Sequence, residues 1–207
     1  MDKARLSIEW LAGCSGCELG IVDLHDRLLR VLEDVDLVRL PILMDEKDYP
    51  EADIGLITGS IRSQHDIEAA NKMRESCRTI IGFGTCSVYG GPQSSGYAHT
   101  KEELFRSSFT ANPTTRTSTI PDQVPELLPG NLPLDSEIEV DVYLPGCPPH
   151  AGFIFDALQG VVRGKKPSEI GRHNVCYNCN RKIVKSDTAK IVRSHEVEMD
   201  PDICFLS

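Results

Sequence analysis

Residues 79–87 have the sequence TIIGFGTCS, in which a compact apolar run ends in a turn that holds Cys86. A run of this kind is typical of a strand buried inside a parallel sheet. Alternating or apolar runs elsewhere in the chain indicate further strands in the same sheet. These are expected at four places: 5–11, 36–43, 53–58 and 138–146.

Segments with helical periodicity lie between these strands. Residues 18–35 repeat apolar side chains at a spacing of three or four, which predicts one amphipathic helix. Two more helices are expected at 64–76 and 150–163. Strands that alternate with helices predict an α/β fold, with an open, flavodoxin-like, mostly parallel sheet and helices on both faces.

The helix–strand pattern ends near residue 165. We therefore expect residues 1–165 to form one domain and residues 166–207 to form a short cysteine-containing C-terminal tail. Within the domain, residues 107–135 are polar and rich in proline and threonine. Such a long connection is usually functional or contacts a partner.

Composition limits the function. The 207 residues are 40% hydrophobic and 26% charged, as in an ordinary globular protein, and carry a formal net charge of −9. The acidic balance argues against nucleic acid and against an anionic membrane surface as partners. Without a long apolar run or the pattern of a secretory leader, we expect no membrane insertion and a cytoplasmic location.

Eight cysteines in a reducing compartment indicate metal or redox chemistry rather than disulfides. Four of them directly follow predicted strands. Because the carboxyl ends of parallel strands share one edge of the sheet, these four thiols should lie together. They are Cys14, Cys17, Cys86 and Cys147.

Four thiolates are the usual ligands of an iron–sulfur cluster or of a structural zinc ion. Glycines stand one or two positions before these cysteines, so the backbone can approach a bulky inorganic group and aim N–H groups at its sulfurs. This pattern favours a cluster. Zinc remains an alternative, although zinc ribbons usually pair two C-x-x-C motifs, and buried core thiols are another.

Three motifs in order, CSGCE (14–18), GTCSVYGG (84–91) and PGCPP (145–149), resemble the small, electron-transferring subunit of nickel–iron hydrogenases. The resemblance extends over residues 8–165. It implies that the four cysteines bind a proximal 4Fe–4S cluster beside the nickel–iron centre of a separate large subunit. The related subunit of respiratory complex I shares the later motifs, but it has two adjacent cysteines in the first.

The first motif and the residues after it are most similar to cytosolic hydrogenases that reduce soluble cofactors, including the methyl-viologen-reducing type linked to heterodisulfide reductase. The resemblance implies a non-catalytic subunit of an oxidoreductase that acts on hydrogen. Electrons would pass from the large subunit through the 4Fe–4S cluster, and then through further electron-transfer subunits to a soluble acceptor. The alternatives are a cluster-bearing subunit of a complex I-like quinone or ferredoxin oxidoreductase, and a zinc-stabilised scaffold.

The tail contains Cys176, Cys179 and Cys204. In longer members of the resembled family this region begins a domain with further 4Fe–4S clusters, so a second cluster is one interpretation. A zinc knuckle that also uses His173 is another, and a tail without metal is a third.

Two further residues have alternative roles. Glu18 follows the C-x-x-C motif, where a carboxylate favours the start of a helix. The resemblance adds a possible proton relay near the large-subunit active site, and no other catalytic residue is expected in this chain. Cys77 stands at the end of the helix predicted at 64–76 and before the strand predicted at 79–84, and we expect a buried, unreactive thiol there.

Overall fold

The structure is a computed structural model that describes residues 3–114, 116, 119–165, 179–184 and 200–204. The chain divides into two compact units, Met1–Gly171 and Arg172–Ser207. We call them the sheet unit and the tail unit. The predicted domain boundary after residue 165 adjoins residues outside the described ones and stays a prediction.

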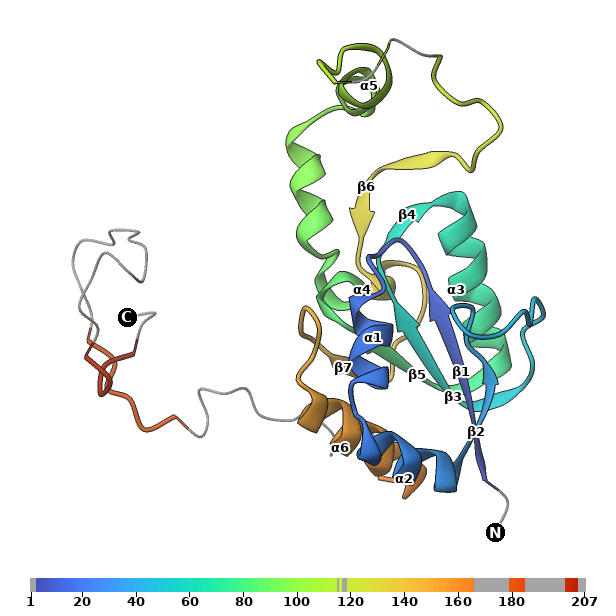
Figure 1. Cartoon of the computed structure of the whole chain (residues 1–207), viewed down its shortest axis with the longest axis vertical. Coiled ribbons are helices and arrows are strands. Elements are labelled where there is room, and N and C mark those ends of the chain that lie inside the picture. Colours follow the sequence, from blue (N-terminus) through green and yellow to red (C-terminus); the bar gives the residue numbers. More distant parts are fainter. Residues whose placement is uncertain (1–2, 115, 117–118, 166–178, 185–199, 205–207) are drawn as a thin grey trace. The chain divides into compact units, whose positions relative to one another are not determined.

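A five-stranded sheet with the strand order β2-β1-β3-β5-β7 forms the centre of the sheet unit (Figure 1). All four strand pairs are parallel. This is the flavodoxin-like doubly wound order, so the predicted fold class is confirmed. The strands are β1 (Ala4–Trp10), β2 (Val35–Arg39), β3 (Ala52–Thr58), β5 (Cys77–Phe83) and β7 (Val142–Leu144).

Helices cover both faces of the sheet (Figure 1). One face packs against α1, α2 and α6, and the other packs against α3. Neighbouring residues of β3 show why both faces need cover. Leu56 and Ile57 point to opposite faces, and both are almost fully buried. The helices are α1 (Gly16–Val22), α2 (Asp26–Asp34), α3 (Gln64–Ser76) and α6 (Ala151–Val162).

The helix predicted at 18–35 is in fact two helices. His25 has a φ of 51°, in the left-handed region, and α2 begins at the next residue. The strand predicted at 36–43 ends at Arg39, and Pro41 has no N–H with which to extend the ladder. The last strand is also shorter than predicted, because the Ile138 N–H donates back to Leu134 O, in the short helix Leu134–Ser136, instead of joining the sheet.

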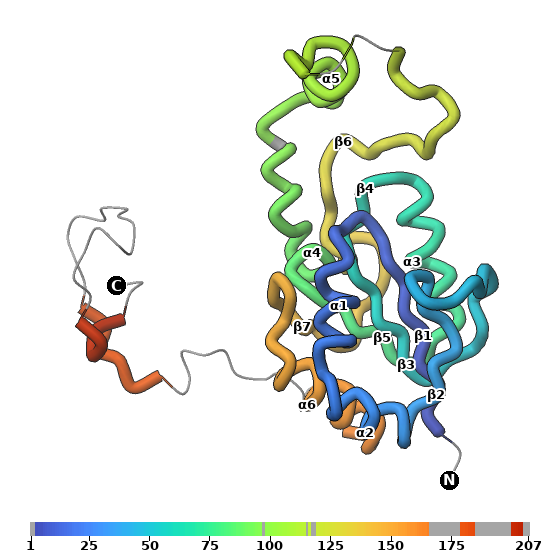
Figure 2. The backbone as a smooth tube through the Cα atoms, in the orientation of Figure 1, coloured from blue at the N-terminus to red at the C-terminus, as the bar shows by residue number. Residues whose placement is uncertain are grey.

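The described part of 107–135 contains a strand where the sequence analysis expected only a loop. It contains β6 (Leu127–Leu132), which pairs antiparallel with β4 (Ile61–Ser63) (Figure 2). The Gln64 N–H, at the start of α3, donates to Glu126 O at 3.1 Å. The other short helices are α4 (Thr85–Tyr89), η1 (Pro92–Ala98), α5 (Lys101–Phe105), η2 (Arg106–Thr110) and η3 (Leu134–Ser136).

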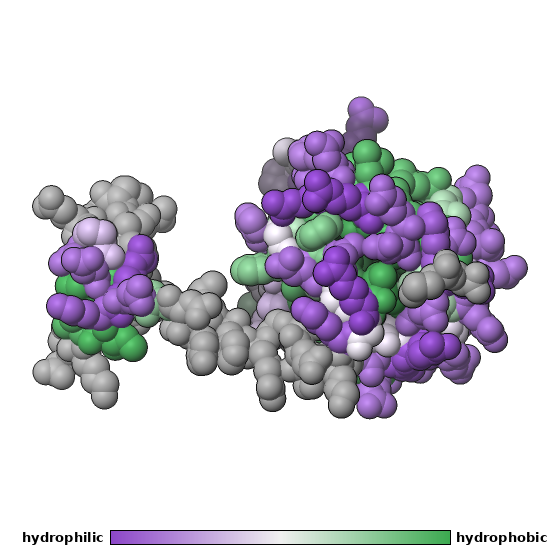
Figure 3. All heavy atoms as spheres, turned by 90° about the horizontal axis from the view of Figure 1, so that it is seen from below, coloured by the Kyte–Doolittle hydropathy of each residue, from purple (hydrophilic) through white to green (hydrophobic). Residues whose placement is uncertain are grey.

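In the tail unit, two described segments are hydrogen bonded to each other. Lys182 N donates to Asp202 O at 2.8 Å, and Cys204 N donates to Lys182 O at 2.9 Å. In the described parts of both units, every helix is too short or too polar to cross a bilayer. The face of the sheet unit seen in Figure 3 is mostly hydrophilic, with apolar areas between the polar side chains.

Candidate metal centre

The four strand-end cysteines line one small cavity of about 80 Å³ beyond the carboxyl edge of the sheet. Cys14 lies in the turn after β1, and Cys17 is in the first turn of α1. Cys86 is in α4, directly after β5, and Cys147 follows β7. The structure therefore brings together the four thiols that the sequence analysis selected. Their role as ligands stays a prediction.

The thiols are close enough to affect each other's charge. Burial, followed by the charges of Glu18, Cys86, Cys14 and Cys147, raises the pKa of Cys17 to about 12. Burial is also the main cause of a raised pKa at Cys86. Four thiolates here would repel one another. Thiols bind metals in the deprotonated form, and the positive charge of a bound metal group would offset the repulsion between them.

Two glycines leave room beside the sulfurs. Gly84 and Gly91 have φ values of 92° and 75°, a region that favours glycine. A Cβ atom on Gly84 would collide with Cys17 Sγ, and one on Gly91 would lie 2.5 Å from Cys86 Sγ. A side chain at either position would fill space next to a sulfur.

Hydrogen bonds join the turns at the sheet edge in two pairs. The turn after β1 is joined to the turn after β3, since Ala12 N donates to Ser60 O at 3.1 Å and Ser60 N donates to Ala12 O at 2.8 Å. The turn after β5 is joined to the turn after β7. There, Thr85 N donates to Gly146 O at 2.7 Å, and Gly146 N donates to Thr85 Oγ1 at 3.2 Å.

Gln93, in η1, contacts both pairs of turns. Its Nε2 donates to Ala12 O at 3.0 Å and to Ser60 Oγ at 3.3 Å, and its Oε1 lies 3.4 Å from Cys86 Sγ. The sequence analysis missed this residue. No spacing rule connects it with Ala12, which precedes it by 81 positions.

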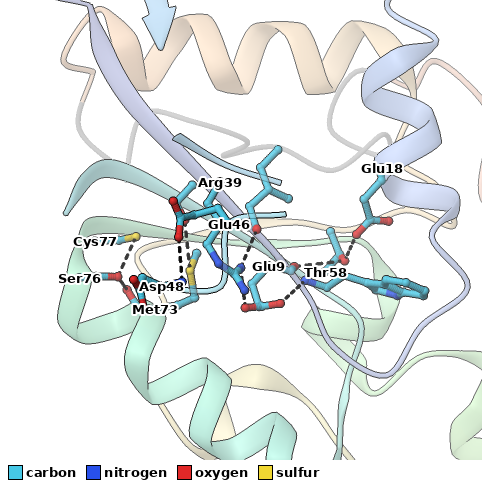
Figure 4. A network of polar contacts seen from close by, with 12 residues as sticks. Glu9, Glu18, Arg39, Glu46, Asp48, Thr58, Met73, Ser76 and Cys77 are labelled. Carbon is cyan, nitrogen blue, oxygen red and sulfur yellow. Dashed lines mark hydrogen bonds and ion pairs between the residues drawn. The ribbon is translucent and has the colours of Figure 1, made fainter. Parts of the chain in front are cut away.

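Glu18 is also part of the cavity wall and is only 3% exposed. Thr58 Oγ1 donates to Glu18 Oε1 and lies 3.4 Å from Glu9 O (Figure 4). Among the residues that the structure describes, Glu18 Oε2 has no hydrogen-bond partner. Nearby, the Glu9 carboxylate forms a buried ion pair with Arg39 at 2.6 Å.

The remaining cysteines lie away from this cavity or outside the described residues. Cys77 is buried beneath α3, as expected, and burial raises its pKa. Cys179 is exposed and Cys204 is half-buried, while His173 and Cys176 lie outside the described residues. In the described part of the chain, no three Cys, His, Asp or Glu side chains are grouped as a single metal ion requires. A metal site in the tail stays a prediction.

Comparison with known proteins identifies the family. The sequence pattern of one family, described as NADH ubiquinone oxidoreductase, 20 Kd subunit, matches residues 14–161. The chain belongs to this family. The matched segment contains all four strand-end cysteines and ends within α6, so it includes every strand of the five-stranded sheet except β1.

Within the 20 kDa subunit family, this chain is similar to hydrogenase subunits. A vhu subunit of the F420-non-reducing hydrogenase of Methanocaldococcus jannaschii is 37% identical, over 94% of this chain and 68% of that protein. The iron-sulfur subunit of the F420-non-reducing hydrogenase of Archaeoglobus profundus is 30% identical, over 98% of this chain and 72% of that protein.

A solved structure gives the same result. In a crystal structure of an NAD+-reducing [NiFe]-hydrogenase in the H2-reduced state, one chain matches with a TM-score of 0.74 and 34% identity, over 80% of this chain and 94% of that chain. The predicted relation to nickel–iron hydrogenase small subunits is confirmed, and the chain is a component of an oxidoreductase complex. The complex I-like alternative is not favoured, because these relatives are hydrogenase subunits.

Proposed function

We propose that this chain is the electron-transfer subunit of a nickel–iron hydrogenase and that its four strand-end cysteines hold a 4Fe–4S cluster. The observation that carries the proposal is the convergence of Cys14, Cys17, Cys86 and Cys147 on one cavity. When bound, such a cluster accepts and releases an electron at a potential set by burial and by hydrogen bonds to its sulfurs.

The residues around the cavity fit a cluster better than a zinc ion. Zinc holds each thiolate sulfur at about 2.3 Å, so its ligands must crowd around one point. Gly84 and Gly91 instead keep additional space beside two of the sulfurs, which suits a larger inorganic group.

The partner we propose is the nickel–iron large subunit, docked over the cysteine edge. Apolar side chains are exposed on α1, whose first residues line the cavity, and on α6: Leu19 and Val22 are 59% and 46% exposed, and Phe153 is 56% exposed. The two helices are adjacent, since a Cβ on Gly20 would lie 3.3 Å from Ile154 Cδ1. We call Leu19, Val22 and Phe153 the apolar edge patch.

A second candidate contact is the described part of 107–135. It forms one side of a mainly apolar cavity of about 410 Å³, which Phe105, Ile120 and Val124 help to line. Electrons would leave through further electron-transfer subunits to a soluble acceptor in the cytoplasm. The similarity to an NAD+-reducing hydrogenase supports this route, because NAD+ is a soluble acceptor.

Glu18 is the candidate proton relay of this proposal. Its Oε1 is held by the Thr58 hydroxyl, which leaves Oε2 at the cavity wall as the atom that would carry a proton. This places a carboxyl group directly after a ligand cysteine, on the side that the large subunit would cover.

Cysteine variants in the co-expressed complex test the proposal. Cys86→Ser and Cys147→Ser should lose or convert the cluster and abolish hydrogen-dependent dye reduction. Cys77→Ser is the matched control, because Cys77 is buried beneath α3 and its loss should leave the iron content unchanged. Equal iron loss in the control, or a colourless protein that contains zinc, would contradict the proposal.

A further inference from the structure

We propose that Gln93 is a positioning residue that holds an amide carbonyl against the Cys86 ligand and thereby lowers the reduction potential of the metal centre. This inference rests on the proposed function. The contact joins Gln93 in η1, a segment that contains none of the cysteine motifs, to Cys86. The inference depends on which end of the Gln93 side-chain amide faces the Cys86 sulfur.

The partners of the amide nitrogen determine that orientation. Ala12 O is a carbonyl oxygen and can only accept a hydrogen bond. The Ser60 hydroxyl donates its own hydrogen to Ala12 O at 3.2 Å, so Ser60 Oγ is left as an acceptor as well. Both atoms therefore require the NH₂ side of the Gln93 amide. The carbonyl Oε1 must then face Cys86 Sγ, 3.4 Å away.

Reversal of the amide would be unfavourable. It would place the NH₂ group at Cys86 but would bring Gln93 Oε1 against Ala12 O. An attractive N–H···O contact would then become a contact between two acceptors, and the partner atoms at Ala12 are partly buried. The hydrogen bonds of the turn between β1 and α1 therefore fix the orientation of the Gln93 amide, whose carbonyl oxygen faces Cys86 Sγ.

The same orientation has different effects on the free thiol and on the metal-bound sulfur. As a thiol, Cys86 donates its proton to Gln93 Oε1. A metal-bound sulfur has no proton and carries negative charge, so it faces the negative end of the amide dipole. Reduction adds further negative charge, which this dipole disfavours. Hydrogen-bond donors aimed at ligand sulfurs have the opposite effect.

Gln93 also lines a cleft of about 550 Å³, whose walls include Ala12, Arg62 and the neighbouring Cys14. Truncation to alanine would therefore change both the dipole and the access of water, and each affects the potential. Methionine has a similar length and no carbonyl group. Gln93→Met keeps the wall and removes the dipole.

The test is a redox titration of the purified complex, followed by electron paramagnetic resonance, with iron content measured on the same samples. Gln93→Met should keep its iron and raise the midpoint potential. A tenfold shift in the one-electron equilibrium corresponds to about 59 mV. The matched control is Gln123→Met, at an exposed glutamine outside the cavity lining, which should leave the potential unchanged.

An unchanged or lower potential in Gln93→Met would overturn the inference, and a lower value would mean that the amide donates to the sulfur. If Gln93→Met loses its iron, Gln93→Leu decides by the same criterion, and iron loss from both variants also overturns the inference. Failure of the proposed function is distinguishable, because the wild-type complex would then lack an iron–sulfur signal.

Discussion

At position 84 both the backbone conformation and a neighbouring sulfur require a residue without a side chain, which is glycine. The φ of 92° is strained for any residue with a side chain, and a Cβ would occupy the space beside Cys17 Sγ. We expect Gly84→Ala to lower the iron content of the complex far below that of the wild type.

Iron assay and the visible spectrum would measure this effect. Gly96→Ala is the control, since a Cβ there would meet only Leu104 Cδ1, at 3.9 Å. Full cluster loading in Gly84→Ala would show that the space beside Cys17 is not needed by the metal group.

The pKa of Cys17 gives a second prediction for the iron-free chain. Only the thiolate reacts with alkylating agents. A pKa of about 12 instead of 9.0 makes the thiolate about a thousandfold scarcer at pH 8. Alkylation of Cys17 by iodoacetamide should be slower by this factor than that of an ordinary thiol, and it should accelerate about tenfold per pH unit.

Mass spectrometry of alkylated peptides would give the rate for each cysteine. Exposed Cys179 serves as the internal reference. Similar rates for Cys17 and Cys179 at pH 8 would mean that the four thiols do not share a buried cavity in the iron-free chain.

Among single elements, α3 begins where its capping residues place it. Ser63 Oγ accepts from the Asp66 N–H, and the Asp66 carboxylate accepts from the Ser63 N–H at 2.7 Å, which forms a capping box. Ser63→Ala should reduce the free energy of unfolding by about 1 kcal/mol. Chemical denaturation would measure it, with Ser63→Thr, which keeps an acceptor, as the control. A loss of the same size in Ser63→Thr would argue against the cap.

The same local signals explain which elements the sequence could predict. The predicted helix 64–76 has the bounds of α3, because its cap and its apolar face are both local. The break in 18–35 depends on the left-handed conformation of His25, which periodicity does not reveal. β6 was missed because its pairing with β4 joins segments more than sixty positions apart.

The candidate site divides in the same way. The four cysteines could be predicted, because each follows a strand and parallel strands end at one edge. Gln93 could not, because its role depends on contacts with Ala12 and Ser60 that exist only after the sheet has formed.

For the whole molecule, the apolar edge patch is the surface on which the proposed large subunit would dock. Leu19 and Phe153 expose most of their side chains on a protein whose net charge of −9 otherwise favours solubility. Leu19→Glu or Phe153→Glu should weaken association with the large subunit by about 2 kcal/mol or more, the cost typical of a central interface residue.

Co-purification and binding measurements would test this. The control is Leu29→Glu on α2, where the leucine is 64% exposed but lies outside the patch. If all three variants bind the large subunit like the wild type, the interface lies elsewhere, and the cavity beside Phe105 becomes the next candidate.

The strand order also has a consequence for biosynthesis. Cys14 and Cys17 leave the ribosome early, but Cys147 follows β7, which is synthesised last and pairs with β5 at the edge of the sheet. The nascent chain therefore has an incomplete set of thiols until nearly the whole sheet unit has been translated. Since domains fold as units during synthesis, delivery of the proposed cluster would be a late step of maturation. The first three thiols need protection from oxidation until then.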